Sequence, residues 1–128
     1  MNKATDVAIR HISAMANHDD AAARALLADD VHFTLITSVP GFPNPAQGDN
    51  AEEFMKLAGG PGNPLVPGSL QVLKGIGDDH QAMILVTVKA AMGPDTSNLL
   101  AARHYTLDEH DKIKNELVII TNYDGEVG

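Results

Sequence analysis

Apolar residues near the start of the chain follow the spacing of amphipathic helices. Between residues 5 and 17 they recur at steps of three and four and form one stripe, which consists of Ala8, Ile9, Ile12, Met15 and Ala16. Thr5 is a suitable N-cap for this helix, and Asp6 suits its first turn because a carboxylate is favourable near a helix N-terminus. The polar residues 18–20 end the stripe, and a second, shorter helix, ended by two aspartates, is predicted over residues 21–28.

Most of the remaining chain has the pattern of β-strands. Apolar and other residues alternate over residues 31–36, which predicts a strand with one face in the core. Four further strands are separated by turns rich in Gly, Pro and Asp, and they are predicted over residues 69–76, 82–92, 99–107 and 113–123. Residues 82–92 are almost wholly apolar, so this strand is expected to be central and covered on both faces. The last two strands form a hairpin through residues 108–111.

The segment between the first strand and the later strands is less regular. Residues 40–48 are expected to form a loop, and Asn50 followed by Glu53 resembles a capping box for a short third helix over residues 51–58. Residues 59–68 contain four Gly and three Pro, so no regular structure is expected there and the segment is interpreted as a mobile flap. Helices followed by strands indicate an α+β fold with a mostly antiparallel sheet.

Composition narrows the classes of function. The 128 residues fit one domain, and the sequence has no internal repeat or linker. The net charge of −8 argues against nucleic-acid binding, because an anionic surface repels phosphates. There is no cysteine, which excludes thiol catalysis, Cys-based zinc sites and disulfides and fits a cytoplasmic location. No signal-peptide core and no stretch of about 18 apolar residues occurs, so no membrane association is expected.

The sequence also lacks the motifs of metal and cofactor sites. The six histidines form no His-x-x-x-His helix pair and no His-x-His strand pair. Neither a Gly-x-Ser-x-Gly nor a Gly-x-x-x-x-Gly-Lys motif is present, so serine-hydrolase and phosphate-loop chemistry have no support. No metal and no cofactor are therefore expected.

Arg103 is the most conspicuous polar residue of the predicted strands. It follows four apolar residues, and an arginine in such a strand is rarely buried without a partner. It is a candidate to bind an anionic or carbonyl group, and the structural alternative is an ion pair with Glu116 across the hairpin. Two registers are open. If Leu107 lies opposite Lys112, Arg103 faces Glu116; a shift of one residue places His104 opposite Glu116 instead.

Three further residues are candidates for a pocket. His11 lies one turn from Met15 at the border of the apolar stripe, where it can donate a hydrogen bond or carry a proton near neutral pH. The alternative is a half-buried histidine bonded to backbone or water. Tyr105 shares a strand face with Arg103, so its hydroxyl can point into a pocket or the ring can simply pack. Met15 fills the core or lines the pocket.

The order of these elements resembles the nuclear transport factor 2-like superfamily, also called SnoaL-like. The segments that carry the resemblance are residues 18–31, Gly48 before the helix at 51–58, and residues 105–113. The resemblance covers residues 1–128 as a single domain. It implies a cone-shaped α+β barrel, in which three N-terminal helices pack on a strongly curved, mostly antiparallel sheet around a pocket. It also implies a homodimer formed through the sheet face. The superfamily hosts many chemistries as well as non-enzymes, so the fold alone does not assign a reaction.

The resemblance can be carried to individual positions. Compared with ketosteroid isomerases, the oxyanion-hole tyrosine falls on His11, the catalytic-base aspartate on Leu35 and the second oxyanion donor on Arg103. The charge-stabilising positions are thus polar, whereas the carboxylate that abstracts the proton is missing. The acidic residue on the last strand of the polyketide cyclases falls on Val118. The Arg-x-Asp arrangement of limonene-epoxide hydrolase is not reproduced, because Tyr105 stands two positions after Arg103.

The sequence therefore predicts a pocket protein that takes a small, mostly apolar organic ligand with one carbonyl or carboxylate. His11 and Arg103 are the candidate catalytic residues, and the candidate ligand-binding residues are Met15, Leu35, Tyr105, Glu116 and Val118. As an enzyme, the protein would use cofactor-free acid/base or electrostatic catalysis of the isomerase, cyclase or dehydratase type. The alternative is a non-catalytic, dimeric ligand-binding or protein-interaction module.

Overall fold

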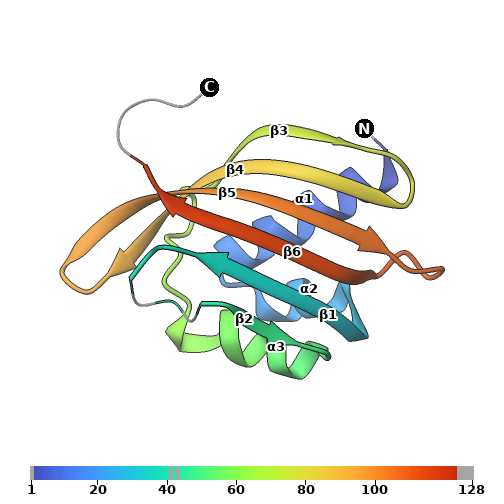
Figure 1. Cartoon of the computed structure of the whole chain (residues 1–128), viewed down its shortest axis with the longest axis horizontal. Helices are drawn as coiled ribbons and strands as arrows, with labels where there is room; N and C mark the ends of the chain where they lie inside the picture. The colour runs from blue at the N-terminus through green and yellow to red at the C-terminus, as the bar shows by residue number, and fades with distance from the viewer. Residues whose placement is uncertain (1, 41, 43, 124–128) are drawn as a thin grey trace.

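The computed structural model describes residues 2–40, 42 and 44–123, and it is shown in Figure 1. The helices and strands follow one another as α1 (Lys3–Ala16), α2 (Asp20–Ala25), β1 (Leu27–Thr37), β2 (Ala46–Gly48), α3 (Ala51–Ala58), the 3₁₀ turn η1 (Gly60–Gly62), β3 (Gln71–Gly77), β4 (Gln81–Met92), β5 (Asp95–Leu107) and β6 (Ile113–Asn122). Within the described residues, none of the helices has the length and apolar character needed to cross a membrane.

The strands form one bent sheet with the helices on its inner face (Figure 1). Its strand order is β2-β1-β6-β5-β4-β3. The pairing of β1 with β6 is parallel, whereas the other neighbours are antiparallel. Helix α1 packs against β3, β4 and β5, and α3 packs against β1. The predicted α+β class, with three helices on a curved and mostly antiparallel sheet, is confirmed.

The first two helices begin and end at other residues than predicted. Asn2, not Thr5, caps α1, because the Asn2 side chain accepts a hydrogen bond from the Thr5 amide and Thr5 itself is buried inside the helix. Helix α2 ends at Ala25 instead of residue 28, because Leu27 already pairs with Ile113 as the first residue of β1. The two aspartates expected to end this helix therefore lie in the strand.

Helix α3 occupies the predicted residues 51–58. The Asn50 side chain accepts a hydrogen bond from the Glu53 amide at 2.8 Å, and its amide group donates to the Glu53 carboxylate at 2.7 Å. The strand just before it approaches β1 closely, because a Cβ atom at Gly48 would lie 2.5 Å from the Phe33 ring. Any larger residue at Gly48 would displace that ring, which lines the cavity described below.

The Gly- and Pro-rich segment 59–68 contains more regular structure than predicted. Gly60–Gly62 form the 3₁₀ turn η1, and Leu65 forms an isolated bridge with Ala90. Asn63 fixes the middle of the segment, since its side chain donates to the Met15 carbonyl at 2.8 Å and accepts from the Leu65 amide at 3.0 Å. Polar contacts with α1 and β4 hold this segment in place. The composition of the segment could not predict them, because they involve residues that are distant in the sequence.

Strand β4 is buried on its inner face but not on both faces, so that prediction is wrong. Ala82, Ile84 and Val86 are almost fully buried under α1, while Met83 on the outer face is 46% exposed. The outer face continues this apolar surface across the sheet with the exposed side chains Ile36, Ile76, Leu117 and Ile119. A run of apolar residues shows that both faces of a strand are apolar, but it does not show that both faces are covered. Here, among the described residues, the helices cover only the inner face of the sheet.

The β5–β6 hairpin has neither of the two predicted registers. Tyr105 lies opposite Glu116 and Arg103 opposite Val118, because a β-bulge shifts the pairing after Leu107, which is opposite Ile113. In a regular strand Ile113 and Glu116 would face opposite sides, since their separation is odd. The bulge places both on the inner face, where Ile113 is fully buried. Arg103 and Glu116 thus share a face as diagonal neighbours.

Candidate functional site

An interior cavity of about 110 Å³ lies between the inner face of the sheet, α1, α3 and the segment after α3. Its walls are mostly apolar and include Met15, Phe33, Leu35, Phe54, Leu99 and Val118. Within the described part of the chain, Arg103 and Glu116 are the charged residues of the lining. The cavity therefore has mostly apolar walls and one charged corner, which lies at the middle of β5 and β6.

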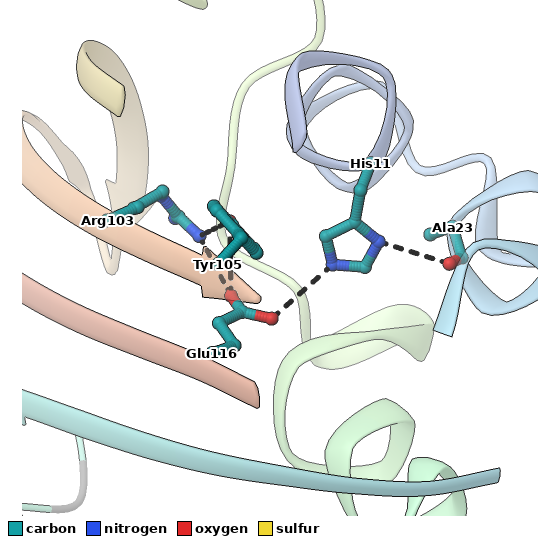
Figure 2. Close-up of polar contacts among 5 residues, drawn as sticks. All are labelled: His11, Ala23, Arg103, Tyr105 and Glu116. Carbon is teal, nitrogen blue, oxygen red and sulfur yellow. Dashed lines mark hydrogen bonds and ion pairs between the residues drawn. The ribbon is translucent and has the colours of Figure 1, made fainter. Parts of the chain in front are cut away.

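Arg103, Tyr105 and Glu116 form a hydrogen-bonded cluster at that corner (Figure 2). One terminal nitrogen of Arg103 donates to the Tyr105 hydroxyl at 3.1 Å and to Glu116 Oε1 at 3.3 Å. The Tyr105 hydroxyl in turn donates to the same Oε1 at 3.2 Å. The Glu116 side chain is 1% exposed and that of Arg103 is 12% exposed, so this is a largely buried ion pair.

His11 approaches the cluster from α1 and is fully buried (Figure 2). Its Nδ1 lies 3.1 Å from the Ala23 carbonyl oxygen, which can only accept, so Nδ1 carries a proton. Its Nε2 lies 3.6 Å from Glu116 Oε2, beyond hydrogen-bond distance. The ring packs against Phe54 and Tyr105, with centroids 5.6 and 6.1 Å away.

This arrangement limits where protons can lie. Because Nδ1 is the donor to Ala23, a neutral His11 ring would turn the lone pair of Nε2 toward Glu116 Oε2. Two acceptors facing each other in a buried site repel. The contact is attractive only when Nε2 or the carboxyl group holds a proton. The two side chains therefore form a buried contact that one proton would make attractive, next to the Arg103 charge.

The buried cluster shifts the acidities of its members. Burial alone would raise the pKa of the Glu116 carboxyl, but the adjacent His11 ring, the Arg103 charge and the Tyr105 hydroxyl hold its pKa below the usual range. Burial raises the pKa of the Tyr105 phenol, which therefore stays a hydrogen-bond donor near neutral pH. Burial would lower the pKa of Arg103, yet Tyr105 and Glu116 raise it, so the guanidinium stays charged.

Some polar atoms at this corner have no hydrogen-bond partner within the described residues. They are Arg103 Nε, Glu116 Oε2 and His11 Nε2, and each is shielded from solvent. A buried polar atom without a partner costs about 1–3 kcal/mol. Of the three residues, Arg103 and Glu116 line the cavity.

The structure brings most of the predicted residues to the cavity wall. Met15, Leu35, Arg103, Glu116 and Val118 line it. His11 and Tyr105 are outside the lining and contact Glu116 from behind, so the Tyr105 hydroxyl points to the carboxylate and not into the cavity.

Other lining residues were not singled out from the sequence. Phe33 and Phe54 are among them, and each occupies an apolar position whose period predicts burial but not a cavity. Asn63 also lines the cavity, and it belongs to a segment whose composition predicts only a loop. Over the described residues, no three His, Asp or Glu side chains are grouped so as to hold a metal ion.

Comparison with known proteins identifies the fold. The chain matches no protein-family model and no curated protein sequence. Among solved structures, a protein from Kribbella flavida is 20% identical with a TM-score of 0.72, over 91% of this chain and 85% of that one. An epoxide hydrolase of the LEH-like type from Mycobacterium tuberculosis is 14% identical with a TM-score of 0.71, over 92% and 82% of the two chains.

A third structure is Rv0760c of Mycobacterium tuberculosis in complex with estradiol-17β-hemisuccinate. It is 16% identical with a TM-score of 0.70, over 98% of this chain and 95% of that one. Proteins described as NTF2-like, from Burkholderia xenovorans, match as well. The element order, the bent sheet and these matches together show that the chain has the fold of the nuclear transport factor 2-like superfamily.

Proposed function

We propose that this chain binds a small, mostly apolar organic molecule with one carbonyl or carboxylate group in its interior cavity. We further propose that it acts on this molecule without a cofactor, by acid/base chemistry at Glu116 and Arg103. The observation that carries the proposal is the charged corner of an otherwise apolar cavity, where Arg103 Nε and Glu116 Oε2 are buried without partners among the described residues. A ligand that supplies a hydrogen-bond acceptor to Arg103 would remove part of this cost.

The arrangement favours proton transfer next to a carbonyl. The Glu116 carboxylate takes a proton from the carbon beside the ligand carbonyl, and the electron pair of that C–H bond moves to the carbonyl oxygen. Arg103 stabilises the resulting negative charge by donating to that oxygen. In a ligand with a β,γ double bond, return of the proton to the γ-carbon of the resulting dienolate moves the double bond into conjugation with the carbonyl. In a ligand with a β-hydroxyl group, the enolate breaks the C–O bond, Glu116 returns the proton to the departing oxygen, and water leaves. Glu116 thus supplies from β6 the carboxylate that Leu35 cannot supply from β1.

His11 has a positioning role in this proposal. The Ala23 carbonyl fixes the ring orientation through Nδ1, and Nε2 then faces the carboxyl group at 3.6 Å. A proton that leaves the ligand for Glu116 can therefore be stabilised by the pair instead of by one isolated buried carboxyl group.

The size of the cavity limits the part of the ligand that it encloses. An engineered apolar cavity of about 150 Å³ binds benzene. The cavity of about 110 Å³ is smaller, so it is expected to enclose at most about one ring. The complex of Rv0760c with estradiol-17β-hemisuccinate supports the idea that this fold can hold apolar organic molecules with a polar group.

Hydrogen–deuterium exchange of a simple ketone tests the proposed chemistry. Cyclohexanone in D₂O is expected to exchange the hydrogens beside its carbonyl faster with the protein than in buffer, as followed by NMR. Glu116→Gln is expected to remove this acceleration, while Glu109→Gln, a matched change at an exposed glutamate, leaves it intact. Acceleration that survives in Glu116→Gln would rule out this carboxylate as the base.

The second candidate function is a non-catalytic, homodimeric ligand-binding module. The exposed apolar outer face of the sheet favours it, because contiguous apolar surface of this kind marks interaction sites. In the same experiment, thermal stabilisation by cyclohexanone without any acceleration of exchange would support this alternative. A cytoplasmic location is part of either proposal and is supported by the absence of cysteine.

A further inference from the structure

We infer that the ligand of the interior cavity is an elongated molecule with two polar ends. In this inference, which rests on the proposed function, the first end binds at Arg103 and an apolar body follows. The second polar group lies outside, in a groove next to Ser97 and Asn122. The substrate class is therefore a long apolar molecule with a carbonyl at one end and a hydroxyl or similar group at the other.

A second hollow lies next to the interior cavity and is open to solvent. It is lined by the loop after β1, the end of α3, the turn between β4 and β5, and the end of β6, and its lining includes Val39, Gly93, Ser97 and Asn122. Phe42, Leu57 and Pro64 line both the interior cavity and this outer groove. The two hollows are therefore neighbours that share these three residues.

The inner faces of β5 and β6 determine which parts of the path from the interior cavity to the outer groove are polar and which are apolar. Every second residue of β5 faces inward, and from the charged corner outward the sequence is Arg103, Ala101, Leu99 and Ser97. On β6 the corresponding sequence is Glu116, Val118, Ile120 and Asn122. On each strand, the inward-facing positions are thus one polar residue at the charged corner, then two apolar residues, then one polar residue in the outer groove.

The length of this path sets the length of the ligand. Six residues separate Arg103 from Ser97 and Glu116 from Asn122, which is roughly 20 Å of strand at about 3.4 Å per residue. The interior cavity alone holds about one ring, so we expect a ligand that reaches both polar ends to pass along the shared residues Phe42, Leu57 and Pro64.

The residues at this joint are suited to such a passage. Leu57 is a large apolar side chain that is 40% exposed on α3. Pro64 is held in place from β4, because its carbonyl accepts a hydrogen bond from the Ala91 amide at 2.7 Å. One wall of the joint is therefore fixed, and the other is an exposed leucine that an apolar ligand body would cover.

Three ketones separate this inference from the proposed function. Cyclohexanone probes the charged corner alone, 2-dodecanone adds an apolar chain, and 12-hydroxy-2-dodecanone adds a terminal hydroxyl to the same chain. Dissociation constants are measured by calorimetry. With the parent protein, the hydroxylated ketone is expected to bind about 3- to 10-fold more tightly than 2-dodecanone, the gain typical of one added hydrogen bond.

Variants at the groove and at the joint locate the effect. Combined Ser97→Ala and Asn122→Ala should abolish the advantage of the hydroxyl group and leave cyclohexanone binding unchanged. Asn115→Ala on the exposed outer side of β6 is the matched control. Leu57→Trp, which narrows the joint, should weaken both long ketones at least 10-fold more than it weakens cyclohexanone, which serves as the reference because Leu57 also lines the interior cavity. Because Leu57 is 40% exposed, folding should be retained, and Leu57→Ala should instead ease entry of the long ketones.

The outcomes distinguish the two ideas. If cyclohexanone binds but neither the chain nor the hydroxyl group improves affinity, the elongated ligand is refuted and the charged corner stands. A hydroxyl advantage that persists in the Ser97→Ala, Asn122→Ala variant also refutes the outer subsite. If no ketone binds, or if Arg103→Met leaves all affinities unchanged, the proposed function fails and this inference falls with it.

Discussion

At the scale of single residues, the ion pair between Arg103 and Glu116 decides how stable the cavity corner is. Removal of one partner from a largely buried pair costs about 3–5 kcal/mol, because the other charge is left uncompensated. We expect Arg103→Met and Glu116→Gln each to lose stability of this order in urea denaturation, and the double variant to recover part of it. Arg10→Met, at an exposed arginine, should change little. Additive losses in the double variant would show that the two side chains do not stabilise one another.

The lowered pKa of Glu116 leads to a separate prediction about how folding stability depends on pH. Its usual value is 4.5, and in the folded chain it is lower, so the unfolded state binds the proton more readily. The stabilisation is therefore complete above the usual carboxyl pKa and is lost as the pH falls through the lower, folded value. We expect Glu116→Gln to reduce the loss of folding stability at low pH, as measured by urea denaturation at a series of pH values from neutral to about pH 3. An unchanged loss of stability in this variant would show that other carboxyl groups cause it.

At the scale of elements, its hydrogen bonds lead us to expect that the segment 59–68 is an anchored wall of the cavity instead of the mobile flap predicted from composition. The Val66 amide donates to the Lys89 carbonyl at 2.9 Å, and the Ala91 amide donates to Pro64 at 2.7 Å. We expect both amides to be protected in hydrogen exchange. Asn63→Ala, which removes one buried and one partly buried hydrogen bond, should reduce that protection and destabilise the chain by about 1–3 kcal/mol. Rapid exchange of both amides in the parent protein would instead indicate a mobile flap.

At the scale of the whole molecule, the outer face of the sheet is the proposed dimer surface. Ile119 lies near its middle and is 49% exposed, with Ile36 beside it on β1. We expect a dimer in light scattering and a monomer for Ile119→Lys, because a charge at the centre of an apolar interface is costly to bury. Leu57→Lys, which adds the same charge away from this face, should stay dimeric. A parent protein that is monomeric at high concentration would exclude this interface.

The sequence predicted the elements better than it predicted their neighbours. The apolar stripe of α1, the Asn50 cap of α3 and the last hairpin all follow from periods and caps that depend on a few adjacent residues. The wrong predictions concern contacts between distant segments. Helix α2 ends early because Leu27 pairs with Ile113, and the outer side of β4 is open because the helices of the described residues lie on the inner face of the sheet.

The candidate site likewise has features that the sequence predicted and features that it could not predict. Arg103 inside an apolar strand had to find a partner or a ligand, and this followed from the sequence because burying an unpaired charge is costly. The position of that partner depended on a bulge in β6, which no local pattern announces. The contact between His11 and Glu116 joins residues at opposite ends of the chain. Periodicity determines which face a side chain occupies, whereas register and packing decide what it meets, and only the tertiary structure fixes those.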